Sequence, residues 1–474
     1  MARFAALTGA LLATTLGSLS SGCAAVGPNY ARPPMPSPAQ FRFVEGAAEA
    51  QSLADSPWWQ VFDDPALQAL VRDAIANNLD LRTAAARVEE SRAIAGIAKS
   101  FLYPQVDGTV GYNMRLSSST AKDNGLGEND DHTRQSATYG LGLAWEIDLF
   151  GRIRRAHESA LALLLATEHG RRGVLVTLVG DVATNYFLLR ELDLQLEISR
   201  QTLRINDDTV TYFRNRLDGG VSNRLELDRI QAMRAETAAA IPEIEQQIAR
   251  VENAVSLLLG RPPGPIARGT SPLASPPPSI PAGLPASLLE RRPDVLAAEQ
   301  LLVSTNADIG AAKALFYPQI NLTSFGGGVA GDISNVLGGA GAMWSLGAGL
   351  LQPIYNAGRN KRNLEATQAR YDAALAQYQK AALNGYREVA DALVAIQKLA
   401  EVRVQREFGV TALVDASDLA RSRYDSGLAS YIEILTADQD LFQQQLLLAA
   451  VRGAELRARA ELYRTLGGGW QPQP

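Results

Sequence analysis

The chain of 474 residues has very few side chains that bind metals or form covalent links: one cysteine, Cys23, and three histidines. A single cysteine excludes an intramolecular disulfide and any metal site built on thiolates. The histidines (His132, His157 and His169) are scattered along the chain, so we interpret each as a solvated side chain rather than a ligand. The formal net charge of −5 argues against nucleic acid as a partner.

Motifs for catalysis are also missing. The chain contains no Walker A sequence, no His-Glu-x-x-His and no Gly-x-Ser-x-Gly. Residues 326–331 match Gly-x-Gly-x-x-Gly, but they belong to a Gly-rich stretch, expected to be a loop from Gly326 to Gly341, without a parallel-sheet unit around it. The sequence therefore predicts neither an enzyme nor a resident cofactor.

Long apolar runs are confined to the start of the chain. No run of 18 or more apolar residues follows residue 22, so no transmembrane helix is expected. Residues 1–22 have the form of a secretory signal, and Ser20-Ser21-Gly22-Cys23 resembles a bacterial lipobox in which Cys23 is lipidated. The alternative is an ordinary signal peptide followed by a stray cysteine. Residues 23–57 are rich in proline and predict an extended, lipidated arm with few hydrogen bonds.

What the chain does contain is the same pattern twice. Lys99–Val106 and Lys313–Ile320 each join a helical run to an alternating run. Each copy continues with a second alternating run, a Gly-Arg pair and a very long helical pattern that is broken once by a glycine turn. We therefore predict two helix-strand-strand-helix repeats, at 58–260 and 288–474, joined by a Pro-rich linker at 261–287.

Four segments alternate with period two, as strands with one apolar and one polar face do: about 105–115, 138–149, 318–325 and 342–353. A membrane barrel strand needs about 9–11 residues of this pattern. The alternative is the edge of a soluble β-sandwich. Four strands cannot close a membrane barrel, because small barrels have at least eight, and an open sheet edge is not viable in lipid. The chain must then oligomerise, two copies giving eight strands and three giving twelve.

The remaining sequence is mainly helical. Residues 152–217 and 359–425 carry apolar side chains at spacings of three and four, and some 65 residues would make a rod of roughly 100 Å. Patterns this long indicate coiled-coil-like packing. After each glycine turn the chain returns as a helix, at 223–260 and 430–466, which predicts two antiparallel hairpins.

The hairpin turns hold the candidate site. Their glycines are Gly219, Gly220 and Gly427. Glu226 and Glu433 follow the turns, and Arg423 and Tyr424 precede the second one. In a symmetric tube these positions form rings, and crowded carboxylates repel one another unless Arg423 or the Tyr424 hydroxyl compensates. Such bonds would hold the hairpins together until a partner breaks them, as a gate does. The alternative is that all four are solvated charges at helix ends.

Several motifs resemble those of the outer membrane factor (TolC-like) family, and especially its NodT-type efflux lipoproteins. The resemblance covers nearly the whole chain. Beyond the Cys23 lipobox, it rests on Asn29–Pro33, Trp58–Pro65, Arg291–Val295 with Ala298 and Glu299, Phe316–Pro318, and Leu466–Trp470.

The resemblance implies a mostly α-helical homotrimer whose four strands per chain form a twelve-stranded outer-membrane barrel, continued by a helical barrel in the periplasm. It implies a passive exit duct, lipid-anchored in the outer membrane of a Gram-negative bacterium, that docks a periplasmic adaptor and an inner-membrane pump. Members of this family close the periplasmic entrance with tyrosine, arginine and acidic residues at the hairpin turns, and the matching positions here are Tyr424, Glu226 and Glu433. Thr436 stands where members often have an inner Asp, and Ala429 where the TolC type has a linking Arg; Ile432 could instead form an apolar constriction.

The favoured function is the export of small molecules such as drugs and toxic compounds. Metal-ion efflux and type I protein secretion use the same kind of duct and stay open as alternatives. Two readings of a different class are a non-conducting structural lipoprotein of the periplasm and an anchored periplasmic enzyme. The amphipathic strands argue against the first, and the missing catalytic constellation argues against the second.

Overall fold

The computed structural model describes residues 25–36, 59, 62–116, 133–269, 291–331 and 341–467. Cys23, the signal segment 1–22 and most of the Pro-rich linker lie outside the described residues. The chain divides into two compact units. Unit 1 comprises Met1–Pro33, Val88–Ala166 and Ala298–Tyr378, and unit 2 comprises Pro34–Arg87, Thr167–Ala297 and Gln379–Pro474. Each unit draws on both predicted repeats, whose boundaries stay a prediction.

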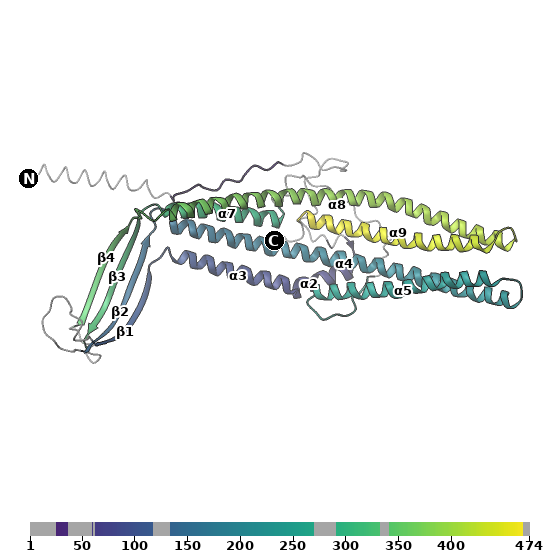
Figure 1. The fold of residues 1–474 in the computed structure, drawn as a ribbon, viewed down its shortest axis with the longest axis horizontal. Coiled ribbons are helices and arrows are strands. Elements are labelled where there is room, and N and C mark those ends of the chain that lie inside the picture. Colours follow the sequence, from purple (N-terminus) through teal and green to yellow (C-terminus); the bar gives the residue numbers. More distant parts are fainter. Residues whose placement is uncertain are drawn as a thin grey trace, which may run out of the picture. The chain divides into compact units, whose positions relative to one another are not determined.

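Helices dominate the described chain (Figure 1). In chain order the elements are α2 (Pro65–Asn77), α3 (Leu79–Ser100), β1 (Gln105–Leu116), β2 (Thr133–Ile147), α4 (Arg152–Asp218), α5 (Arg224–Leu258), α7 (Pro293–Ala314), β3 (Gln319–Ala330), β4 (Ala342–Leu351), α8 (Arg359–Asp425) and α9 (Tyr431–Thr465). Helices α4 and α8 both have 67 residues, α5 and α9 both have 35, and α3 and α7 both have 22. These equal lengths confirm the duplication.

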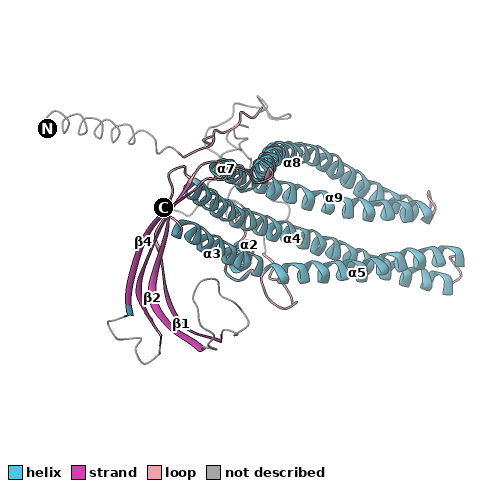
Figure 2. Cartoon of the chain, turned by 60° about the vertical axis from the view of Figure 1, so that its left-hand side comes forward, coloured by secondary structure: helices cyan, strands magenta, loops and turns pink. Residues whose placement is uncertain are grey.

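Unit 1 contains one antiparallel sheet of four strands in the order β1-β2-β3-β4 (Figure 2). Residues opposite one another on neighbouring strands share a face, and the register aligns Val110 with Tyr139, Trp145 with Leu322 and Leu346 with Ser324. All four alternating patterns therefore contribute to one apolar face, as predicted. Its large side chains are Val106, Val110, Tyr112, Met114, Tyr139, Leu141, Leu143, Trp145, Ile147, Ile320, Leu322, Trp344, Leu346 and Leu350.

Strands β2 and β3 differ most from their predicted bounds, and β4 ends at Leu351 rather than 353. Strand β2 starts at Thr133 rather than 138 and ends at Ile147 rather than 149, because the Asp148 carboxylate accepts a hydrogen bond from the Arg154 backbone and caps α4 instead. Strand β3 continues through the glycines from Gly326, which were expected to form a loop. Their missing side chains let the strands approach closely, since a Cβ on Gly327 would lie 2.0 Å from the Tyr139 carbonyl oxygen.

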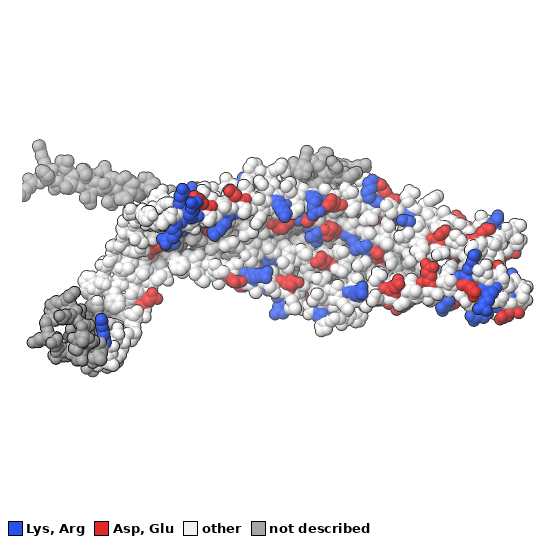
Figure 3. Space-filling model, in the orientation of Figure 1, with Lys and Arg blue, Asp and Glu red and all other residues white. Residues whose placement is uncertain are grey.

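The sheet has two open edges. Within the described residues, β1 pairs only with β2 and β4 only with β3. The apolar face is bare at these edges: Val110 on β1 is 92% exposed and Trp344 on β4 is 81% exposed. Figure 3 shows that the viewed surface of the sheet carries few charges, whereas acidic and basic side chains are interspersed over the helices. Unpaired backbone beside an exposed apolar face indicates a surface that is covered in the working protein.

The N-terminal arm is tied to unit 1 by hydrogen bonds, although a weakly bonded arm was expected. The Val26 N–H donates to the Phe150 carbonyl at 3.0 Å, and Asn306 donates to the Pro28 carbonyl at 3.0 Å. Two motifs of the family resemblance meet here, because Tyr30 and Arg32 both donate to the Glu299 carboxylate. Residues 25–33, the described part of the arm that belongs to unit 1, are thus packed into that unit by specific bonds.

Unit 2 has its main hydrophobic core where α2, α4, α5 and α9 meet, with Leu67, Val182 and Ala460 fully buried. Asp64 caps α2 by accepting from the Ala66 and Leu67 N–H groups. Its other oxygen accepts from the Tyr186 hydroxyl at 2.6 Å, and burial together with this bond raises the pKa of Tyr186 to about 12. Helix α4 includes one stretch that is long and apolar enough to cross a membrane, but half of that stretch is buried inside the chain.

Candidate functional site

Both hairpin turns end a long helix in the same way. Gly220 has φ +73°, its N–H donates to the Leu217 carbonyl, and the Val221 N–H donates to the Arg216 carbonyl. Gly427 also has φ +73° and repeats both bonds with Tyr424 and Arg423. This is the Schellman arrangement, which needs a left-handed residue at the glycine position. Gly219 lacks a positive φ, and Ser426 occupies the equivalent place in the other turn.

We expect Gly427→Ala to lower the free energy of unfolding by about 1–2 kcal/mol, because a side chain in the left-handed region is strained although no atom obstructs it. Gly219→Ser should leave the free energy of unfolding nearly unchanged and serves as the control. Thermal unfolding of both variants, followed by far-UV circular dichroism, measures the difference. Equal losses in both variants would contradict the assignment.

A hydrophobic cluster joins the α4–α5 hairpin to the α8–α9 hairpin near these turns. Phe213 of α4 is fully buried, and its ring lies 4.1 Å from the ring of Tyr431 at the start of α9. Ile230 of α5 and Ile434 of α9 complete the contact. Near the turns the two hairpins are therefore held together by packing.

Tyr424 reaches across from α8 to α4. Its ring stands edge-on to Tyr431 at 5.4 Å, and the Arg216 guanidinium lies 5.8 Å from its centre. Arg216 also donates to the Tyr212 hydroxyl at 2.9 Å. Burial, and to a lesser extent the charge of Glu226, raise the pKa of Tyr424. Within the described chain the Tyr424 hydroxyl makes no hydrogen bond, so this side chain acts through its ring.

The two predicted acidic residues have local partners. The Glu433 carboxylate lies 3.7 Å from the Arg423 guanidinium, which ties α9 to α8 inside one hairpin, and both side chains are about half exposed. Glu226 accepts a hydrogen bond from Ser222 at 2.6 Å, while its backbone N–H is capped by Asn223. Within the described residues, neither carboxylate bonds to the opposite hairpin.

Ile432 and Thr436 lie outside this cluster. They are one turn apart on an exposed part of α9, and the Thr436 hydroxyl donates to the Ile432 carbonyl at 2.9 Å. The Thr436 hydroxyl therefore donates its hydrogen bond within its own helix. It does not take the place of the Asp that other family members often have at this position. The equivalent positions of the two turns instead expose aliphatic side chains, namely Val221 and Leu225 in one and Leu428 and Ile432 in the other.

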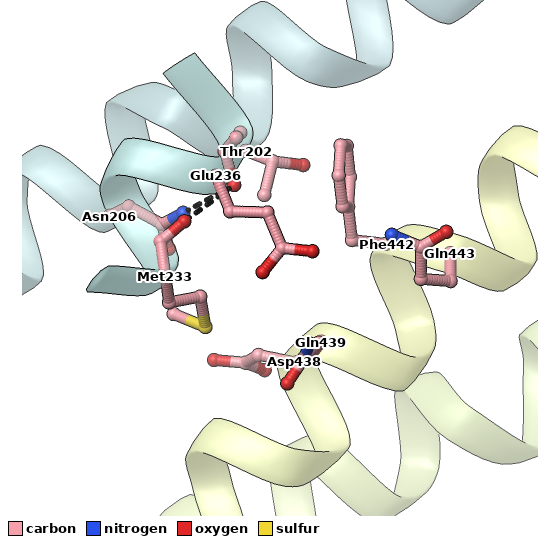
Figure 4. A pocket seen from close by; sticks show the side chains of 9 residues that line it. Thr202, Asn206, Met233, Glu236, Asp438, Gln439, Phe442 and Gln443 are labelled. Carbon is pink, nitrogen blue, oxygen red and sulfur yellow. Dashed lines mark hydrogen bonds between the residues drawn. The ribbon is translucent and has the colours of Figure 1, made fainter. Parts of the chain in front are cut away.

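Two hollows lie between the hairpins. An open groove of about 450 Å³ runs beside Tyr212, Tyr424 and Asp425. A cavity of only about 10 Å³ lies farther from the turns, where Glu236 of α5 faces Asp438 of α9 and Asn206 donates to Thr237 (Figure 4). Among the described residues, no group of three acidic, histidine or cysteine side chains could hold a metal ion.

Sequence reasoning missed the α4 half of the site. Arg216 and Phe213 supply the contacts that Tyr424 makes with the other hairpin, and Tyr212 packs against Phe213 and accepts a hydrogen bond from Arg216. The duplication carries a usable signal, because Arg216 occupies the place in the first turn that Arg423 occupies in the second. The aromatic partners carry no comparable signal, since buried rings on a helix are usually core.

Comparisons with known proteins agree with this fold. The family model described as outer membrane efflux protein matches residues 70–261 and 284–468. The cation efflux system protein CusC of Escherichia coli O6:H1 is 33% identical over 460 residues, covering 95% of this chain and 96% of that protein. The toluene efflux pump outer membrane protein TtgI of Pseudomonas putida is 35% identical over 455 residues, with coverage of 95% and 96%. The solved outer-membrane channel OprN superposes with a TM-score of 0.86 at 31% identity, covering 94% of this chain and 100% of that one.

Proposed function

This chain belongs to the outer membrane efflux protein family, and we propose that it serves as the passive outer-membrane exit duct of a tripartite efflux system. The observation that carries the proposal is the four-stranded sheet with one bare apolar face and two open edges, on a chain that is otherwise helical hairpins. Such a sheet suits lipid on one side and a polar passage on the other. Transport energy would come from the pump, and the chain would perform no catalysis.

The open edges support an assembly of several copies, which we propose to be a homotrimer. In lipid, every backbone donor and acceptor must be paired, so β1 of one copy would pair with β4 of the next. Three copies give twelve strands and two give eight. The family resemblance favours three. Mass measurement of the purified protein in detergent tests this directly, and a dimer would overturn it.

A lipid anchor on Cys23 is a further part of the proposal. It rests on the small residues before the cysteine, and the site lies outside the described residues. We expect Cys23→Ser to abolish incorporation of labelled palmitate, since serine offers no thiol to form the thioether link with the diacylglyceryl group. Gel fluorography of cells fed the label measures this, with the wild type as reference. Equal labelling of both proteins would contradict the anchor.

We also assign a gate to the hairpin turns. The proposed closed state is held by Tyr424 against Arg216 and Tyr431, and by Arg423 against Glu433. Opening requires the two hairpins to separate, which removes the first set of contacts. A partner drives this only by binding the open arrangement better than the closed one.

The exposed aliphatic side chains at the turns suit a periplasmic adaptor as that partner. Val221, Leu225 and Leu428 are 61–70% exposed, which is unfavourable for a surface that stays in water. Replacing all three with serine should weaken adaptor binding and leave channel conductance unchanged. Crosslinking in cells and bilayer conductance separate the two effects. Undiminished crosslinking would place the adaptor elsewhere.

Small organic molecules are the favoured cargo, and metal ions the alternative. The relatives' names point both ways, because CusC is a cation efflux system protein and TtgI is a toluene efflux pump protein. Deleting the gene and measuring the tolerance to solvents, antibiotics and metal salts decides between them. Absence of any conductance from an intact trimer would favour the structural lipoprotein instead.

A further inference from the structure

The passage from β4 into α8 exposes two large side chains. Ile354 is 89% exposed and Tyr355 is 88% exposed, although apolar and aromatic groups of this size usually find cover. They follow the bare end of β4, where Leu350 and Leu351 are 67% and 60% exposed. The apolar surface of the sheet therefore continues into this turn.

Two cations come directly after it. Arg359 and Lys361 lie in the first turn of α8, where the helix carries no acidic residue. Both are exposed, and neither side chain has a hydrogen bond or ion pair within the described chain. A helix N-terminus is already partly positive, so cations there are electrostatically unfavourable unless an anion joins them.

In the first repeat, the cations at the start of the long helix have acidic partners within the chain. These cations, Arg152 and Arg154, form ion pairs with Glu146 and Asp148 just before α4. Counted back from the shared glycines, Gly358 and Gly151, the positions of these two acids are taken by a proline and by Tyr355 in the second repeat. The second repeat has thus exchanged internal counter-ions for an aromatic ring and two free cations.

A third cation and two more rings border this turn. Asn360 donates to the Leu315 carbonyl at 2.7 Å and Gln352 donates to the Phe316 carbonyl at 3.1 Å, which packs the end of α7 against the turn. Lys313 and the rings of Phe316 and Tyr317, each about two-fifths exposed, belong to that end. Basic side chains gather where the sheet meets the helices in Figure 3. We name the set Lys313, Phe316, Ile354, Tyr355, Arg359 and Lys361 the junction patch.

We propose that the junction patch binds the phosphate groups of anionic phospholipids at the membrane surface. The proposal rests on the proposed function, which places the sheet in lipid. Aromatic rings favour the boundary between acyl chains and headgroups, and Ile354 and Tyr355 would lie there. Arg359 and Lys361 would then reach the phosphates with their charged ends, supplying the missing anions.

The test uses the full chain, purified in detergent and stripped of lipid, with phosphatidylglycerol as the probe. Native mass spectrometry measures its binding beside that of phosphatidylcholine and inorganic phosphate. We expect Arg359→Gln with Lys361→Gln to weaken phosphatidylglycerol binding about twentyfold, near fivefold for each charge removed. Phosphatidylcholine binding should change less than twofold. The matched control is Arg370→Gln with Lys380→Gln, two exposed cations farther along α8 that should leave both lipids unaffected.

Three outcomes would overturn the proposal. The double variant could bind phosphatidylglycerol as the wild type does. Inorganic phosphate could displace the lipid at equal concentration, which would indicate a site for the free ion. The variant could instead dissociate the trimer without changing lipid binding, which would show that Arg359 and Lys361 pair with a neighbouring copy. Bilayer conductance keeps the two ideas apart, because channels that conduct while the wild type and the double variant bind phosphatidylglycerol equally well uphold the duct alone.

Discussion

Simultaneous replacement of Tyr424 and Arg216 with alanine should raise the open probability of single channels in planar bilayers about thirtyfold for each hairpin pair. The variant removes the cation–π contact, worth about 0.5–1 kcal/mol, and the ring contacts with Tyr431 and Phe213, worth about 0.5–1.5 kcal/mol each. A total near 2 kcal/mol lost from the closed state alone corresponds to that factor. Wild-type channels should show small, brief openings and the variant should stay open.

Tyr424→Phe is the matched control, because it keeps the ring and removes only a hydroxyl that makes no hydrogen bond in the described chain. We expect its conductance to change less than threefold. Glu226→Ala should also have a small effect, since Glu226 bonds to Ser222 on its own hairpin. If Tyr424→Phe opened the channel as fully as the alanine variant, a hydroxyl bond to another copy would hold the gate. Unchanged openings in every variant would move the gate elsewhere, for example to Ile432.

Arg292→Ala should produce the largest loss of stability, about 3–5 kcal/mol. Arg292 is 6% exposed, and its side chain donates to Asp294, to Glu388 and to the Thr465 carbonyl. Burial works to lower its pKa, but these bonds outweigh burial and the pKa lies above the usual value. Removing the guanidinium leaves the Thr465 carbonyl at the end of α9 without this donor, and leaves Glu388 with only one ion-pair partner among the described residues, the more distant Arg387, 3.8 Å away.

The control for this variant is Arg362→Ala, whose ion pair with Glu365 is largely exposed and should contribute less than about 1 kcal/mol. Thermal unfolding in detergent, followed by far-UV circular dichroism, compares the two. Equal midpoints would show that Arg292 is dispensable. Arg292→Lys should recover only part of the loss, because an ammonium cannot hold the carboxylates and the carbonyl at once.

The strands could be predicted from sequence because apolar and polar residues alternate in them over many consecutive positions. Period-two alternation gathers the apolar side chains on one face, and the register brings those of all four strands onto the same face. The ends of the strands could not be predicted in the same way. The polar start of β2 at Thr133 and the glycines of β3 from Gly326 join the sheet through backbone pairing, which leaves no pattern in the side chains.

The candidate gate was predictable in position but not in its contacts. Glycines that need a positive φ mark both turns, and charged residues beside them are visible in the sequence. Which hairpin each side chain touches depends on how two long helices are rotated against each other. A small rotation of α8 about its axis decides whether the Tyr424 ring contacts Arg216 or solvent. The local sequence carries no signal for that rotation.

The hydrogen bond between Val26 and Phe150 has a consequence for the reach of an acyl group on Cys23. Three residue steps separate Cys23 from Val26. An extended chain spans at most about 3.6 Å per residue, so the two residues lie no more than about 11 Å apart. An acyl chain attached there would have to enter the bilayer close to the start of α4. The N-terminal arm would then set the depth of the sheet in the membrane. Inserting a few residues between Cys23 and Val26 would let that depth vary, although the strands themselves would be unchanged.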